Sequence, residues 1–392
     1  MNFGRALREW WPLEPDITYL NHGTVGVVPR RVLAKQQAIR DRIEQHPSRG
    51  MLREVVNMLA EPRDPSGWLR DAAAEVAAFV GAASSDLVFI ENATTGVNTV
   101  LRSIPWAAGD ELVLTDHAYG AVAYAAHHIT SQHGAVVRTI PMPYPVFDRD
   151  ELVRRVEGSL SPRTRLLLID HVTSESALIL PLREIAAVAA ARGVPVLVDA
   201  AHAPGVVPID LATLGVTWYT ANLHKWAHAP RSAAFLWVAR DHQRDLHPLV
   251  ISWNLGTGFT AEFDWVGTRD PSSYLAAPEG LAMLRELGQP ARDYMHDLAW
   301  RGARALCDRW GTTLGRDEAS VGAMVTMPLP EAFGRTRADA VRLRDALLFE
   351  DGIEVALHAG YDRLWLRICA QVYNEWADIE RLGDAVARRI PR

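Results

Sequence analysis

Short apolar runs alternate with helical patterns between residues 86 and 240. The runs are rich in Val, Ile and Leu, and amphipathic or alanine-rich stretches separate them. Runs of this kind are typical of buried strands in a mostly parallel sheet that is connected by helices. We therefore predict an α/β domain with right-handed crossovers. The expected strands lie within 86–90, 110–115, 164–172, 194–202, 218–226 and 232–239.

The pattern changes after about residue 280. Helical patterns at 279–288 and 340–352 flank β-like pieces at 321–329 and 363–370, which is typical of a small α+β domain. Residues 46–67 contain Pro and Arg and are expected to be irregular in part. The expected organisation is an N-terminal segment packing with the small domain (1–15), a large α/β domain (16–280) and a small α+β C-terminal domain (281–392).

Composition and charge narrow the class of protein. The chain has 392 residues, 48% hydrophobic and 22% charged, which fits a globular enzyme in solution. A net charge of -6 gives no basic field for nucleic acid. The two cysteines cannot form a disulfide framework, so reduced thiols and a cytoplasmic location are expected. The N-terminus lacks the features of a signal peptide, and no apolar run approaches the ~18 residues of a membrane span.

Polar residues follow directly after several of the strand-like runs. Ligands of open α/β sheets bind at the carboxyl ends of the strands, so these side chains should converge on one crevice. The residues in question are Thr94, His117, Ser174, Asp199 and His202.

Two of the strand ends carry groups suited to a pyridine cofactor. Lys225 lies beside Trp226, Leu223 and Tyr219, and an apolar, aromatic pocket lowers the pKa of a lysine. Asp199 ends a run without other charges, where it suits either a helix N-cap or an ion pair with a pyridine nitrogen. An aspartate at one strand end and a lysine at the next favour pyridoxal 5'-phosphate (PLP) as the cofactor.

Six motifs in this order resemble those of class V, fold-type I PLP enzymes, and the resemblance is greatest to the isopenicillin N epimerase-like branch. It extends over nearly the whole chain, and cysteine desulfurases are more distant relatives. The fold implied is a large domain with a mostly parallel sheet of the seven-stranded type. The motifs are NATTGVN (92–98), TDHAYGA (115–121), DHVTSESA (170–177), DAAHAPG (199–205), NLHKW (222–226) and WVGTRDPSSYL (265–275).

The resemblance implies roles for residues around the cofactor. Lys225 matches the Schiff-base lysine, Asp199 the partner of the pyridine nitrogen, and His202 the residue that binds the 3-oxygen. His117 matches the residue that stacks on the ring. The phosphate-binding positions are Ala93, Thr94, Thr95, Asn222 and His224, together with Gly267 and Thr268 reaching from the neighbouring subunit of a homodimer. Four of these residues have a plainer alternative: a helix cap for Thr94, a core histidine for His117, and an ordinary turn for Gly267 and Thr268.

The same resemblance implies a site for an amino-acid substrate. Arg367 matches the arginine that grips the α-carboxylate, a task that suits a planar bidentate guanidinium. A surface ion pair is its plainer alternative. Asn21, His22, Ser174 and Tyr119 match positions that line the pocket, and Tyr119 is also a candidate catalytic group. The resemblance implies no metal ion.

The reaction type remains open between three outcomes of proton removal at the α-carbon. Epimerisation is expected first, and C–S β-lysis of a cysteine conjugate or transamination are the alternatives. An epimerase needs acid–base groups on both faces, with His22 and Tyr119 as candidates beside Lys225. The stretch 352–365 has no cysteine, which argues against a persulfide-forming desulfurase. A non-catalytic PLP-fold binding protein is the alternative from a different class, and it would not need Lys225 and Asp199.

Overall fold

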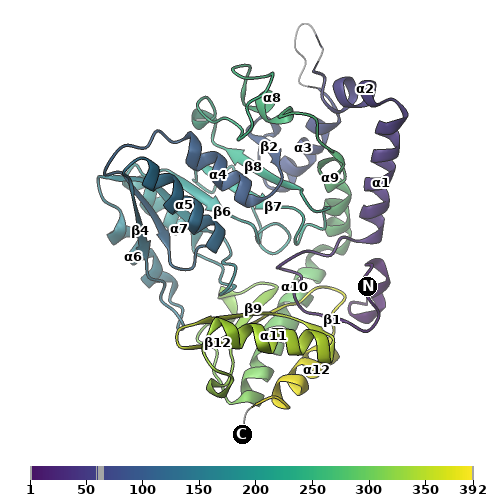
Figure 1. Ribbon diagram of the computed structural model, residues 1–392, viewed down its shortest axis with the longest axis vertical. Coiled ribbons are helices and arrows are strands. Elements are labelled where there is room, and N and C mark those ends of the chain that lie inside the picture. The colour runs from purple at the N-terminus through teal and green to yellow at the C-terminus, as the bar shows by residue number, and fades with distance from the viewer. Residues whose placement is uncertain (1, 59, 61–65, 391–392) are drawn as a thin grey trace.

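The computed structural model describes residues 2–58, 60 and 66–390 (Figure 1). Its centre is a seven-stranded sheet in the order β2-β8-β7-β6-β5-β3-β4. All neighbouring pairs are parallel except those of β8, which runs antiparallel to both β2 and β7. The strands are β2 (Leu87–Ile90), β3 (Glu111–Thr115), β4 (Val136–Ile140), β5 (Thr164–Asp170), β6 (Val196–Asp199), β7 (Trp218–Asn222) and β8 (Ala234–Val238).

Helices cover both faces of this sheet. In β5, Leu166 and Leu168 belong to a buried cluster with α4 (Ala93–Ser103) and α5 (Gly120–Gln132). Leu167 and Ile169 point to the opposite face and join the larger cluster there. This alternation is the period-two pattern of a strand that is buried on both sides. The helices of the second cluster include α3 (Trp68–Phe79), α6 (Arg149–Ser159) and α7 (Leu182–Ala191).

The C-terminal part of the chain forms a second, smaller layer below the large sheet in Figure 1. A three-stranded antiparallel sheet, β11-β12-β9, packs with two helices, and the pair β1-β10 joins the N-terminal region to it. The elements are β1 (Thr18–Tyr19), β9 (Met324–Pro328), β10 (Ile353–Glu354), β11 (Ala356–Gly360), β12 (Arg363–Cys369), α11 (Arg337–Asp351) and α12 (Trp376–Ala387).

The long helix α10 (Ala277–Trp310) connects the two layers, and Gly288 interrupts it with a non-helical backbone. Residues before the break, such as Leu284, belong to the larger core, whereas Leu298 and later residues belong to the smaller one. The helix thus runs through residue 280, and a domain boundary there stays a prediction. The remaining helices, α1 (Arg30–Gln45), α2 (Pro47–Arg49), α8 (Phe259–Asp264) and α9 (Ser272–Leu275), cluster with the larger layer in Figure 1.

The N-terminal segment lies beside the small layer. Gly4 N donates to Val372 O at 2.7 Å, and the ring of Trp11 contacts that of Tyr373 at 5.0 Å between centroids. Part of the predicted irregular stretch 46–67 is helical, since α2 is followed by a π-helical turn over Gly50–Val55. Residues 59 and 61–65 of that stretch lie outside the described residues.

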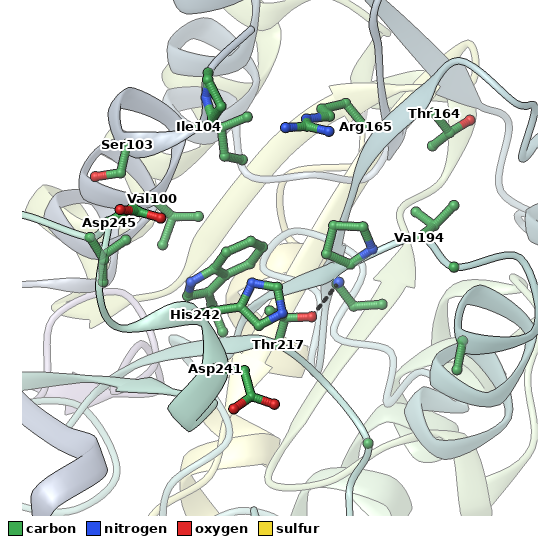
Figure 2. Close-up of a pocket in the computed structure, with 18 residues that line it drawn as sticks. Val100, Ser103, Ile104, Thr164, Arg165, Val194, Thr217, Asp241, His242 and Asp245 are labelled. Atoms are coloured by element: carbon green, nitrogen blue, oxygen red, sulfur yellow. Dashed lines mark hydrogen bonds between the residues drawn. The ribbon is translucent and has the colours of Figure 1, made fainter.

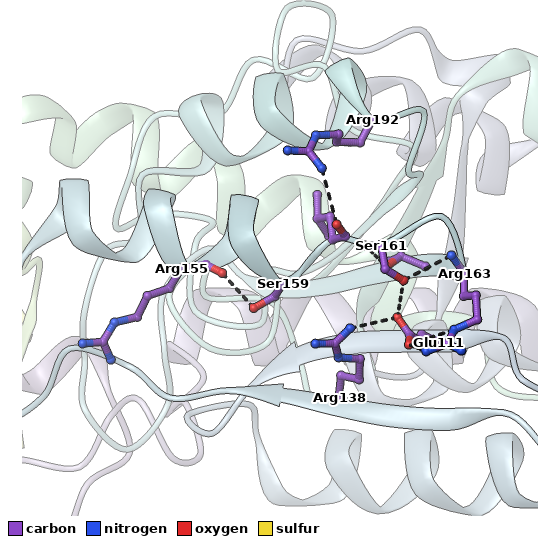
Figure 3. Close-up of polar contacts among 9 residues, drawn as sticks. Glu111, Arg138, Arg155, Ser159, Ser161, Arg163 and Arg192 are labelled. Carbon is purple, nitrogen blue, oxygen red and sulfur yellow. Dashed lines mark hydrogen bonds and ion pairs between the residues drawn. The ribbon is translucent and has the colours of Figure 1, made fainter.

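A buried carboxylate ties together the amino-terminal edge of the sheet (Figure 3). Glu111, at the start of β3, accepts from Ser161 Oγ at 2.6 Å and pairs with Arg163 at 2.9 Å and Arg138 at 3.2 Å. These contacts, with that of Ser161 first, lower the pKa of Glu111. The cluster fixes β3, β4 and the loop before β5 at the edge opposite to the ends that carry the predicted site residues.

The six strands predicted from the sequence are confirmed, as are the mostly parallel sheet and the change to α+β structure. The apolar runs gave no sign of the antiparallel direction of β8. Strands β4 and β11 and the short strands β1 and β10 were not predicted from the sequence.

Candidate active site

A cavity of about 180 Å³ opens at the carboxyl ends of β5, β6 and β7. Four of the five polar residues that follow strand-like runs line it, and His117 lies outside its lining. The predicted site residues that the structure brings together here are Ala93, Thr94, Tyr119, Ser174, Asp199, His202, Asn222, His224 and Lys225.

Lys225 lies in the turn after β7, and its Nζ is 3.0 Å from His202 Nε2. Burial, and then the positive charge of Arg367, lower the pKa of Lys225 to about 8. The ammonium ion therefore loses its proton more easily than an exposed lysine does, which suits a nucleophile. The backbone is held close on one side, because a Cβ at Gly26 would lie 2.4 Å from His224 O and 2.7 Å from Lys225 O.

His202 is oriented by the tryptophan that follows Lys225. Trp226 Nε1 donates to His202 Nδ1 at 3.4 Å, so the neutral ring carries its proton on Nε2 when Lys225 is the free amine. Burial, and then the charges of Lys225 and Arg367, keep the pKa of His202 well below its usual value. A neutral imidazole with Nε2–H directed at the Lys225 amine can also donate to an oxygen placed there.

Asp199 ends β6 and is buried, with Ala201 N donating to its Oδ1 at 3.0 Å. Burial raises the pKa of Asp199, and Lys225 opposes that effect. No salt bridge joins Asp199 to any arginine or lysine in the described part of the chain. A buried carboxylate without a cation is costly, and a protonated pyridine nitrogen would supply the missing partner.

The amino end of α4 forms another side of the cavity. Asn92 caps the helix by accepting from Thr95 N at 2.9 Å, and Asn222 Oδ1 accepts from Ala93 N at 2.8 Å. Thr94, in the same first turn of α4, lines the cavity. The N-terminus of a helix favours an anion, so this turn suits a phosphate group. The Thr95 N–H is occupied by the cap, and Thr95 lines a separate pocket with Arg269 instead.

His224 also lines this end of the cavity. Its Nδ1 lies 3.0 Å from Ala233 O, which leaves the other ring nitrogen for a phosphate oxygen. Burial lowers the pKa of His224 to about 4. A phosphate dianion would oppose this shift by favouring the imidazolium ion.

Arg367 lies on β12 and is 4% exposed, so it is not a surface ion pair. Its Nη1 donates to Ser174 O and its Nη2 donates to Thr24 Oγ1 at 2.7 Å and, more weakly, to Asn21 Oδ1 at 3.4 Å. Its Nε has no partner, and no carboxylate of the described residues forms a salt bridge with it. A buried guanidinium that is held by neutral oxygens retains its charge for an incoming carboxylate.

The two candidates for a second acid–base group lie in different environments. His22 is fully buried, with Nδ1 3.0 Å from Tyr373 Oη and Nε2 3.1 Å from the Lys225 carbonyl oxygen. Both of its nitrogens are engaged behind the lysine, and it does not line the cavity. Tyr119 does line the cavity and is 47% exposed.

His117 follows β3 and is held at both ring nitrogens. Its Nδ1 lies 2.7 Å from Ser176 Oγ, and its Nε2 lies 2.7 Å from the hydroxyl of Tyr361. Burial lowers the pKa of His117 to about 4. The ring is therefore neutral near pH 7, as expected of a group that stacks on an aromatic cofactor.

Gly267 and Thr268 are not brought to this cavity. Both lie in the loop between α8 and α9, where Thr268 is exposed and Gly267 adopts φ +116°. An exposed loop of this kind is compatible with a contact to a second subunit, and that role stays a prediction.

A larger cavity of about 580 Å³ lies at the opposite edge of the sheet (Figure 2). It is lined by Thr164, Val196 and Trp218, which are at or near the starts of β5, β6 and β7. Because ligands of α/β sheets bind at the carboxyl ends, and because Lys225 lies at that other edge, the smaller cavity is the candidate site.

The small cavity fits PLP as judged from its own residues. Asp199 has no salt-bridge partner among the described residues, and the amino end of α4 faces the same space. Arg367 does not line the cavity, but it donates to Ser174 and Thr24, which do, and it has no carboxylate partner among the described residues. In the described part of the chain, no three His, Cys, Asp or Glu side chains form a possible metal site. Within those same residues, no helix has both the length and the apolar composition that a bilayer crossing requires.

Several residues of the site were not assigned from the sequence. Asp170, Thr24, Trp226, Ser176 and Tyr361 enter only through spatial contacts with predicted residues. One unused signal was composition, because Lys225 and Lys35 are the only lysines of the chain. Lys35 is exposed on α1, which leaves Lys225 as the buried lysine.

Comparisons with known proteins agree with this site. The family model described as aminotransferase class-V matches residues 29–273. A probable chloroplastic L-cysteine desulfhydrase of Arabidopsis thaliana is 32% identical over 95% of this chain and 83% of its own. Isopenicillin N epimerase of Streptomyces clavuligerus is 32% identical over 95% of both chains.

The fold is also that of solved structures. The cystine C–S lyase C-DES, in complex with its reaction product cysteine persulfide, superposes with a TM-score of 0.80 at 22% identity, over 96% of this chain and 99% of that one. The fold is thus fold-type I, and the chain belongs to the aminotransferase class-V family as a PLP-dependent enzyme.

Proposed function

We propose that the protein is a C–S β-lyase that releases sulfide from L-cysteine, or a thiol from a small S-substituted cysteine. The observation that carries the proposal is the arrangement of acid–base groups: Lys225 and Tyr119 line the cavity, whereas His22 is buried behind Lys225 and does not line it. The desulfhydrase and epimerase relatives are about equally similar to this chain and do not separate the two reactions.

These positions of the acid–base groups support elimination. An epimerase requires a proton donor on the second face of the α-carbon, and His22 is sealed behind Lys225. Elimination needs only one base at the α-carbon. Lys225, with its pKa lowered to about 8, is suited to that task.

The residues divide the reaction between them. Arg367 binds the substrate carboxylate, and Lys225 Nζ removes the proton from the α-carbon. PLP, when bound, supplies an electron sink for the charge that develops there. Tyr119 donates a proton to the departing sulfur as the Cβ–S bond breaks, and the released 2-aminoacrylate hydrolyses to pyruvate and ammonia.

A persulfide on the protein itself is not part of this proposal. Cys307 and Cys369, the two cysteines of the chain, are both buried, and neither lines the cavity. Sulfur therefore leaves from the substrate directly as sulfide or thiol.

Epimerisation is the second candidate, and the position of Tyr119 at the cavity is the observation that favours it. In that case Tyr119 would return the proton to the second face. Transamination and a binding role without catalysis have no comparable support from the described side chains.

We further propose that the enzyme acts as a cytoplasmic homodimer. The segment 249–255 exposes Leu249, Val250, Ile251 and Trp253, and Trp253 is 81% exposed. Such an apolar patch is unfavourable in water unless a partner covers it. It precedes the loop with Gly267 and Thr268, in keeping with a second copy that completes the phosphate end of the site.

The test is incubation of the PLP-loaded enzyme with L-cysteine in D2O. Equal amounts of sulfide, pyruvate and ammonia are expected, and all three should be absent in Lys225→Ala. Formation of D-cysteine without sulfide would overturn the elimination and support the epimerase. Tyr119→Phe then separates the two roles: slower sulfide release supports elimination, whereas loss of D-product with deuterium still exchanged at the α-carbon supports epimerisation.

A further inference from the structure

Tyr361 lies at the tip of the hairpin formed by β11 and β12, far in sequence from His117. The loop has two residues, Tyr361 and Asp362, and the flanking Gly360 and Arg363 are register partners. The Tyr361 hydroxyl lies 2.7 Å from His117 Nε2, so a turn of the small layer reaches a side chain of the large sheet. Tyr361 is 48% exposed, so burial of the side chain alone does not explain its position.

The backbone of this turn is unfavourable for its sequence. Tyr361 and Asp362 have φ values of 51° and 56°, the left-handed region that two-residue hairpins usually fill with Asn-Gly. A bulky aromatic residue at positive φ is uncommon, and such strain concentrates at functional sites. A turn selected only for stability would not place a tyrosine here.

Ser176, the second hydrogen-bond partner of His117, also lies beside a residue with a positive φ. Ser176 Oγ contacts His117 Nδ1, and the next residue, Ala177, has φ 56°. Ser176 Oγ also lies 2.7 Å from Thr173 Oγ1, within the same tight loop. Both hydroxyls that hold the imidazole are thus presented by strained backbone segments, one on each side of the ring.

Aromatic contacts limit the movement of the Tyr361 ring, and Asp116 makes a second polar contact with its hydroxyl. It packs against Tyr144 at 4.9 Å and Trp365 at 6.5 Å between ring centroids. Burial, and then the charge of Asp116, raise the pKa of Tyr361 to about 12. The hydroxyl therefore stays protonated and keeps its ability to donate over the working pH range.

We propose that Tyr361 is a positioning residue that fixes the His117 imidazole against the cofactor ring, and so couples the β11–β12 hairpin to the cofactor. This inference rests on the placement of His117 at the cofactor, but not on which bond of the substrate is cleaved. Arg367 lies on β12 of the same hairpin, so the hairpin that carries the proposed carboxylate contact also contacts His117 through its turn.

The test uses Tyr361→Phe, which keeps the ring contacts and removes only the hydroxyl. We measure the Kd for PLP and the visible circular dichroism of the bound cofactor, neither of which requires turnover. The expected result is a Kd raised about 2- to 10-fold, as for the loss of one hydrogen bond, with a changed dichroic band. His117→Ala should change the same two signals, and adding Tyr361→Phe to it should change them no further.

Asp362→Gly is the matched control, because it relieves strain at the neighbouring position and leaves the phenol in place. It should leave the Kd and the dichroic band unchanged. Tyr361→Gly should keep the urea midpoint of the apo-protein at or above that of the wild type while weakening PLP binding.

Two outcomes would contradict the inference. If the Kd for PLP and the dichroic band stay unchanged in Tyr361→Phe but both change in His117→Ala, the role of Tyr361 is wrong while His117 still lies at the cofactor. Unchanged signals in His117→Ala would overturn the inference together with the placement of His117, and neither result would affect sulfide release by the wild type.

Discussion

Asp170 and Asp199 are register partners at the carboxyl ends of the neighbouring parallel strands β5 and β6, and both side chains are buried at the same cavity. Register partners on parallel strands point to the same face, so the two carboxyl groups are neighbours. Asp170 Oδ2 has no hydrogen-bond partner. Burial and then the charge of Asp199 raise the pKa of Asp170 well above its usual value.

This pair predicts a pH dependence of stability. Below the unfolded-state pKa of about 3.9, Asp170 is protonated in both the folded and the unfolded protein. Its contribution to the free energy of unfolding is then fully present. As pH rises toward the raised folded-state pKa, the unfolded chain has lost a proton that the folded protein keeps, so stability falls. The slope is at most about 1.4 kcal/mol per pH unit for one proton.

Asp170→Asn removes that titration, and the apo-protein should lose less stability between about pH 4 and 7 than the wild type does. Urea unfolding across this range measures the difference. Asp245→Asn, a change at an exposed site, is the control and should follow the wild type. Parallel curves for the wild type and Asp170→Asn would contradict the buried pair.

The reactivity of Lys225 gives a second prediction that needs no cofactor. Labelling of the apo-protein with an amine reagent, followed by peptide mass spectrometry, should show Lys225 reacting with a midpoint near pH 8. Lys35, the other lysine, is exposed and serves as the internal reference. Because the charge of Arg367 lowers the pKa of Lys225, Arg367→Ala should move the midpoint to higher pH, whereas Arg231→Ala should not.

Arg367 is predicted to bind the substrate carboxylate. Arg367→Lys should raise KM strongly because an ammonium cannot reproduce bidentate geometry. Arg367→Ala should cost roughly 2–5 kcal/mol in kcat/KM, since the pair is desolvated. The absorption spectrum of the bound cofactor should stay normal in both variants. A kinetic titration with L-cysteine checks this, and an unchanged KM in Arg367→Ala would remove the residue from the site.

Asp199→Asn is predicted to slow the chemical step while keeping the size of the side chain. Loss of the charge that stabilises a protonated pyridine nitrogen should lower kcat by about 10²- to 10⁴-fold. Steady-state kinetics with saturating PLP measure it. If kcat stayed the same, Asp199 would serve only its contact to the Ala201 N–H.

The sequence was informative where burial is uniform. The apolar runs of β5 and β6 are buried on both faces, and they predicted strands whose polar ends meet at one edge. Strand β4 was missed because it is an edge strand with mostly exposed residues and no continuous apolar run. The direction of β8 was missed because a strand's apolar pattern is the same in either direction.

Within the site, recognition of motifs identified side chains but not their surroundings. His22 matches a pocket-lining position, yet its two ring nitrogens are occupied by Tyr373 and by a carbonyl oxygen, which no linear pattern reveals. Tyr361 was missed for a related reason, because its contact to His117 joins residues 244 positions apart.

The hairpin of β11 and β12 therefore has an evolutionary consequence. It carries Arg367 and Tyr361 but none of the side chains that line the cofactor end near Asn222 and His224. Drift in the strand residues around Arg367 can change which amino acid is accepted, as long as the tip keeps the contact between Tyr361 and His117. A family with one cofactor cradle can in this way diversify its substrates by exchanging residues of two antiparallel strands while the turn that joins them is retained.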